Sequence, residues 1–136
     1  MTTNPVLQFT LALAPAEAEA RVREALQQQG FGILTEVDIA ATLRAKLGIE
    51  TPPHRILGAC NPRLAHASIQ AEPSVAAFLP CGLALRQGDV PNETIIAIQD
   101  PLLLAGAFEA PALAPVAEEV STLLRAAMAS IGARPC

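Results

Sequence analysis

The sequence predicts one α+β domain spanning residues 1–136, a two-layer sandwich with helices packed mainly on one face of a mixed, mostly antiparallel sheet of about five strands. Three observations carry this prediction. Segments in which every second residue is apolar alternate with segments of helical period along the chain. Two strand-like segments follow each other near the end, as in a hairpin. The length of 136 residues, without an internal repeat or a long linker, is typical of a single domain.

The elements of the N-terminal part follow from periodicity and from helix-boundary residues. Alternating apolar residues predict strands over residues 7–13 and 31–37. Between them, Pro15 favours the first turn of a helix that Gly30 ends. After the second strand, Asp38 is a good N-cap for a short amphipathic helix.

A third strand and a helix are predicted around the middle of the chain. Residues 50–53 end in two prolines and form a connector that cannot be helical. The strand follows over residues 55–60. Asn61 and Pro62 are a helix-start signal, because the first can cap the helix and the ring of the second is already fixed near helical φ.

The C-terminal part is predicted to contain a hairpin and a long helix. Residues 79–86 and 94–98 read as two strands joined by a loop rich in Gly, Asp, Pro and Asn. Residues 101–111 are expected to form an Ala- and Leu-rich loop. The last helix is predicted over residues 114–130.

The charge and composition argue against nucleic-acid and membrane partners. The net charge is −4, no basic cluster is present, and Trp and Tyr are absent. The protein therefore offers neither a basic surface for the phosphates of a nucleic acid nor Trp or Tyr rings on which its bases could stack. No apolar run approaches the roughly 20 residues that cross a bilayer. The apolar stretch at residues 6–14 lacks the basic start of a signal peptide, so we expect a cytoplasmic protein.

The cysteines are expected to be reduced thiols. The chain has three of them, Cys60, Cys81 and Cys136, an odd and sparse set in a chain without a signal peptide. No C-x-x-C motif occurs.

We also expect a homodimer. Hydrophobic residues make up 51% of the chain, and only 16% of the residues are charged. The few aromatic residues mean that Ala and the aliphatic residues build the core, so apolar surface is left that a second copy would cover.

Cys60 is the strongest candidate for a functional side chain. It ends a predicted strand directly before a helix start, where the positive end of the helix favours a thiolate. His66 follows on the same helix and Cys81 begins the next strand, so both could lie near Cys60. The alternative is structural: free Cys is among the most buried residue types, and His66 can be a surface residue.

Two kinds of thiol chemistry are open at this turn. Cys60, Cys81 and His66 could together hold Zn²⁺ or Cu⁺, although no closely spaced ligand pair is present. The two thiols could instead form a redox pair, which requires their backbones to lie within about 7 Å.

Glu36 and Gly58 are the other positions of interest. Glu36 shares a strand face with Asp38 and is either a solvated strand residue or a carboxylate beside a pocket. Gly58 lies inside a strand, which usually marks a bulge or the close approach of another group.

Three motifs give the chain a family resemblance. They are Gly-Phe-Gly-Ile-Leu-Thr-Glu at residues 30–36, Gly-Ala-Cys-Asn-Pro at residues 58–62 and Leu-Pro-Cys at residues 79–81. In combination they resemble the family known as domain of unknown function 302, over nearly the whole chain. Gly82 departs from the family pattern, which often has Asn there. The resemblance implies a small α+β fold and dimers, and it brings no established activity.

Two classes of function follow for the same turn. The first is a dimeric binding module with a small-ligand or metal pocket formed by Cys60, Asn61, His66 and Cys81, with Glu36 as an outer candidate. The second is a thiol enzyme or redox protein that uses Cys60 as a nucleophile and His66 as a base. No Ser nucleophile elbow, phosphate-binding loop or dinucleotide motif indicates a standard enzyme class.

Overall fold

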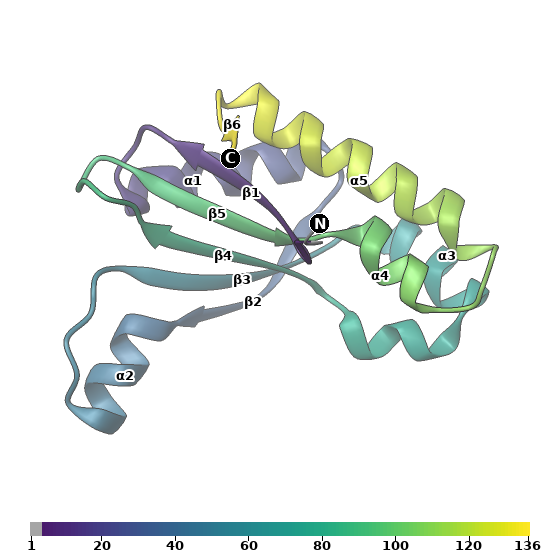
Figure 1. Ribbon diagram of the computed structural model, residues 1–136, viewed down its shortest axis with the longest axis horizontal. Coiled ribbons are helices and arrows are strands. Elements are labelled where there is room, and N and C mark those ends of the chain that lie inside the picture. The colour runs from purple at the N-terminus through teal and green to yellow at the C-terminus, as the bar shows by residue number, and fades with distance from the viewer. Residues whose placement is uncertain (1–3) are drawn as a thin grey trace.

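A computed structural model describes residues 4–136 and shows one sheet with helices packed against it (Figure 1). The sheet has six strands in the order β2-β3-β4-β5-β1-β6. Their bounds are β1 (Val6–Leu11), β2 (Gly32–Asp38), β3 (His54–Cys60), β4 (Cys81–Gln87), β5 (Thr94–Gln99) and β6 (Arg134–Pro135).

Helices connect most of the strands. They are α1 (Pro15–Gln28), α2 (Ile39–Leu47), α3 (Pro62–Ala71), the 3₁₀ helix η1 (Pro73–Phe78), α4 (Pro101–Ala107) and α5 (Leu113–Ser130). Because three strands lie between β1 and β2 in the sheet, α1 has to cross the sheet to connect them. Among residues 4–136, no helix combines the length and the apolar character needed to cross a membrane.

The predicted α+β architecture is confirmed, with two refinements to the sheet. All five strand pairings are antiparallel, so the sheet is not mixed. The additional strand is β6, a two-residue segment that pairs with Phe9 and Thr10 of β1 after α5 has returned along the sheet. So short a segment has no periodicity from which a strand could be predicted.

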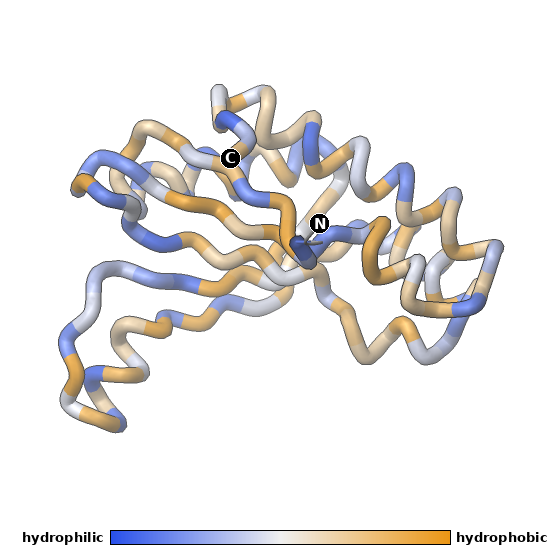
Figure 2. Tube along the Cα trace, in the orientation of Figure 1, coloured by the Kyte–Doolittle hydropathy of each residue, from blue (hydrophilic) through white to orange (hydrophobic). Residues whose placement is uncertain are grey.

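The core lies between the sheet and two helices. Alternate residues of the central strands are buried, among them Leu57, Leu83, Ile96 and Ile98. Val22 and Leu26 of α1 and Leu124 and Met128 of α5 are fully buried in the same cluster. Helices thus cover one face of the sheet, as the sequence predicts, and the hydrophobic residues run along the central strands in Figure 2.

The opposite face of the sheet carries the other alternate residues, and we call it the open face. The strand register places Val37, Ile56, Ala84, Ala97 and Gln8 in one row across five strands. Val37 is 43% exposed and Ile56 is 37% exposed. The row is therefore apolar over most of its length and is partly accessible to solvent.

The segment after β5 is a helix where the sequence analysis expects a loop. Asp100 caps α4 by accepting a hydrogen bond from the Leu102 backbone N–H at 3.0 Å, and Pro101 occupies the first turn. The Asp-Pro pair is a helix-start signal of the same kind as Asn61-Pro62. This helix, together with α3, η1 and the start of α5, gathers at one end of the sheet, whereas α2 projects from the other end (Figure 1).

Candidate functional site

The two candidate cysteines lie at the ends of two neighbouring strands, on the side of the sheet where β3 leads into α3. Cys60 is the last residue of β3, and Cys81 is the first residue of β4. The register pairs Ala59 with Cys81, so the two cysteine backbones are adjacent across the ladder. Both side chains are half-buried free thiols.

Gly58 fulfils the prediction of a close approach inside a strand. It lies opposite Thr35, next to a bulge in β2 between Ile33 and Thr35. A Cβ atom at Gly58 would lie 2.6 Å from Cγ of Pro80 and closer still to Oγ1 of Thr35. The missing side chain thus lets β2 and the segment before β4 approach β3.

Asn61 fixes the turn from β3 into α3. Its Oδ1 accepts a hydrogen bond from the Leu64 backbone N–H at 3.4 Å, which confirms the predicted cap. Its Nδ2 donates to the carbonyl oxygen of Gln29 at 3.3 Å. Gly30 has a φ of +86°, and a Cβ atom there would lie 3.1 Å from the same Nδ2. The side chain of Asn61 is therefore packed between the end of α1 and the start of α3.

A cavity of about 70 Å³ lies at this end of the sheet, between the strand ends, α3, η1, α4 and α5. Cys60, Cys81 and Asn61 all line it. The other lining residues are mostly apolar: Phe31, Ala59, Leu64, Ala65, Ser68, Val75, Phe78, Leu79, Gln99, Pro101, Leu104, Ala105, Leu113, Ala117 and Val120. Phe78 of η1 lines the cavity and is itself 42% exposed. Water fits in a space of this size, and so does a small organic molecule.

An aromatic pair joins two of the segments around the cavity. The rings of Phe78 at the end of η1 and Phe108 after α4 meet edge to face, with centroids 5.7 Å apart. This is a favourable geometry for aromatic rings. The contact connects η1 to α4.

The thiol of Cys81 is neutral at physiological pH. Desolvation by burial, together with the neighbouring Cys60, raises the pKa of Cys81 to about 11. A buried thiol resists ionisation because the thiolate loses its hydration. The apolar surroundings of Cys81 therefore disfavour the thiolate, which is the form that acts as a nucleophile.

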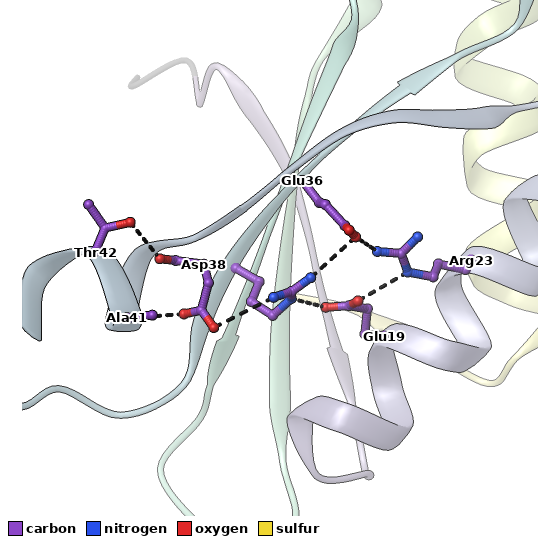
Figure 3. A network of polar contacts seen from close by, with 7 residues as sticks. Glu19, Arg23, Glu36, Asp38, Ala41 and Thr42 are labelled. Carbon is purple, nitrogen blue, oxygen red and sulfur yellow. Dashed lines mark hydrogen bonds and ion pairs between the residues drawn. The ribbon is translucent and has the colours of Figure 1, made fainter. Parts of the chain in front are cut away.

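His66 and Glu36 lie elsewhere. His66 is exposed on α3 and is not among the residues that line the cavity. Glu36 accepts hydrogen bonds from Arg23 and Arg55, and Arg55 also binds Glu19 at 2.5 Å, so that the four form one ionic network on β2, β3 and α1 (Figure 3). Glu36 is thus a partner in a surface ion-pair cluster.

No three-residue metal site is formed in the part of the chain that the structure describes. Across residues 4–136, no group of three or more His, Cys, Asp and Glu side chains is placed to hold a metal ion. The structure therefore brings Cys60, Cys81 and Asn61 together at one cavity and leaves the imidazole of His66 outside it.

Gln99 is a site residue that the sequence analysis does not single out. It ends β5 and lines the cavity, and a Cβ atom at Gly82 would lie 3.4 Å from its Nε2. Its Oε1 is buried and has no hydrogen-bond partner among residues 4–136. A polar residue after the alternating residues of a strand resembles any solvent-facing position, so no pattern in the sequence distinguishes it.

The comparisons with known proteins concern the family and the fold. The model of DUF302, a domain of unknown function, matches residues 7–131. One similar solved structure is the crystal structure of an uncharacterized conserved DUF302 protein from Bacillus stearothermophilus, with 30% sequence identity and a TM-score of 0.80. The match covers 90% of this chain and 95% of that one. A search of functionally curated proteins gave no match. The family model and the shared fold confirm the resemblance seen in the three motifs, and the protein belongs to the DUF302 family.

Proposed function

We propose that the protein is a binding module that holds a small, largely apolar molecule in the cavity beside Cys60 and Cys81. The observation that carries this proposal is the cavity itself, because well-formed apolar hollows with a few polar groups are the usual form of small-ligand sites. Apolar cavities bind apolar guests when the guest replaces poorly held water.

The residues around the cavity favour binding over thiol catalysis. Among the described residues that line it, none is a His, Asp, Glu, Lys or Arg. A thiol nucleophile needs a nearby base or a lowered pKa, and the pKa of Cys81 is raised. His66, the expected base for Cys60, is exposed on α3 and does not line the cavity, so it has no part in the proposed binding site.

Dissolved xenon tests the cavity, because xenon is an apolar probe of small volume. We expect saturable NMR shifts of the methyl groups of Leu64, Leu113 and Val120, which line the cavity. The variant Ala117→Leu fills the lining and should abolish these shifts. Ala114→Leu, on an exposed part of the same helix and outside the lining, is the control and should leave them intact. Absence of saturable shifts in the wild-type protein would overturn the proposal.

The second part of the proposal is a homodimer that buries the open face. Its support is the exposure of apolar residues on this face, Val37 at 43% and Ile56 at 37%, because exposed apolar patches usually mark interfaces. The row through Val37, Ile56 and Ala84 offers an apolar surface that would pair with its own copy under two-fold symmetry.

Light scattering at micromolar concentration tests the dimer. We expect a particle of twice 14.2 kDa for the wild-type protein. Ala84→Glu introduces a charge in the middle of the row and should give a folded monomer. Ile69→Glu alters another exposed apolar residue, on α3, and should remain dimeric. A wild-type particle of 14.2 kDa would contradict the proposal.

The proposed compartment is the cytoplasm, supported by free thiols on two adjacent strands. In a reducing compartment, neighbouring cysteines stay reduced and do not form a disulfide. Alkylation of the native, non-reduced protein after denaturation should modify all three cysteines. Modification of Cys136 alone would show a bond between Cys60 and Cys81 and an oxidising origin.

A further inference from the structure

One buried polar atom of a residue that lines the cavity lacks a hydrogen-bond partner. Oε1 of Gln99 is buried, and no residue from 4 to 136 donates a hydrogen bond to it. Leaving a buried acceptor unsatisfied costs free energy, so such atoms in native proteins are usually completed by water or by a ligand. The orphaned oxygen belongs to a residue of the cavity lining, so a molecule held in the cavity could supply the missing donor.

The same wall offers no group that could balance a charge. The described lining residues carry no carboxylate, ammonium, guanidinium or imidazole. The Cys81 thiol is protonated at neutral pH because burial raises its pKa. An ionic guest would lose its hydration without gaining a counter-charge, which is strongly unfavourable.

We propose that the ligand is a small neutral molecule with an apolar body and one N–H or O–H group that donates a hydrogen bond to Oε1 of Gln99. This inference rests on the proposed binding function and specifies the chemistry of its ligand. The apolar body occupies the space between Leu64, Leu104 and Val120. In the free protein, water supplies the donor, and the ligand displaces it while keeping the hydrogen bond.

Four probes of similar size separate the possible chemistries. Propionamide is neutral and a donor, 2-butanone is its neutral counterpart without a donor, propionate is anionic and propylammonium is a cationic donor. Methyl NMR titrations at pH 7 would give the dissociation constant of each. We expect propionamide to bind at least about fivefold more tightly than 2-butanone, the effect of one net hydrogen bond. The two ions should bind at least about tenfold more weakly than propionamide.

The variant Gln99→Leu links the preference to the residue. It removes the carboxamide and keeps a side chain of similar size, so propionamide should lose its advantage over 2-butanone while 2-butanone binding is retained. Gln99→Met serves the same purpose if the leucine variant does not fold. Gln27→Leu, at an exposed position of α1 outside the cavity lining, is the control, in which the preference for propionamide should persist.

The outcomes distinguish this inference from the proposed function. Equal affinities of propionamide and 2-butanone would overturn the inference but not the proposed binding function. Tightest binding of either ion would likewise overturn the inference alone. A preference for propionamide that survives in Gln99→Leu would also overturn it. If xenon and all four probes fail to bind, the binding function itself is wrong.

Discussion

The side-chain amide of Asn61 donates a hydrogen bond to the carbonyl oxygen of Gln29 at 3.3 Å. The carbonyl belongs to the C-cap residue of α1, and the amide belongs to the N-cap residue of α3. One side chain therefore joins two helix ends that are 32 residues apart in the sequence, directly beside the cavity.

This double role predicts a larger effect of Asn61 substitutions than a cap alone would have. Asn61→Ala removes the cap and leaves the Gln29 carbonyl without its donor, so we expect the free energy of unfolding to fall by about 2–3 kcal/mol. Asp100→Ala removes only the exposed cap of α4 and should cost about 1 kcal/mol. Urea denaturation measures both variants. Equal losses would show that the bond to Gln29 contributes nothing.

Gly58 is predicted to tolerate no side chain. In Gly58→Ala the new Cβ would lie 2.6 Å from Cγ of Pro80, which forces β2 or the segment before β4 to move. Overpacking of this kind costs about 1–3 kcal/mol. Gly32→Ala is the matched control in the same sheet, because no atom lies within 4 Å of its added Cβ. Thermal unfolding should show a clear loss for the first variant and a small change for the second, and similar behaviour would contradict the close approach.

The thiol of Cys81 is predicted to react slowly and to make stability depend on pH. The folded pKa is raised to about 11, whereas the thiol of an unfolded chain ionises near 9. The unfolded state therefore loses its proton first, and the free energy of unfolding should fall as the pH rises from about 9 to about 11, by up to about 3 kcal/mol. Cys81→Ala should remove most of this slope in urea titrations. A stability that is flat over this range in the wild-type protein would contradict the raised pKa.

Arg55 is predicted to hold the ionic network of β2, β3 and α1 together. It contacts Glu19, Glu36 and Asp38, and the Glu19 side chain is only 15% exposed. Arg55→Gln removes the cation that contacts all three carboxylates and leaves Glu19 and Glu36 to Arg23 alone, so we expect a loss of about 1 kcal/mol at pH 7. Arg63→Gln breaks the exposed pair with Glu119 and should change stability little. Chemical denaturation of both variants at pH 7 makes the comparison, and an equal loss in the two variants would contradict the special role of Arg55.

The sequence by itself determined the local elements, because their signals lie within a few residues. Alternating apolar residues predicted the first two strands, connector and turn residues predicted the next three, and Asn61-Pro62 predicted the start of α3. The same kind of signal at Asp100-Pro101 marks α4, although the sequence analysis expected a loop there. The three motifs determined the family in the same way, since each is a continuous stretch of chain.

Only the tertiary structure decided how these elements meet. The pairing of Ala59 with Cys81 and the apolar wall that raises the pKa of Cys81 depend on contacts between distant segments. The direction of a side chain on a helix depends on what packs around that helix, and His66 proved to be exposed for this reason. Gln99 became a candidate because burial and the lack of a donor are properties of three-dimensional surroundings, which local periodicity does not contain.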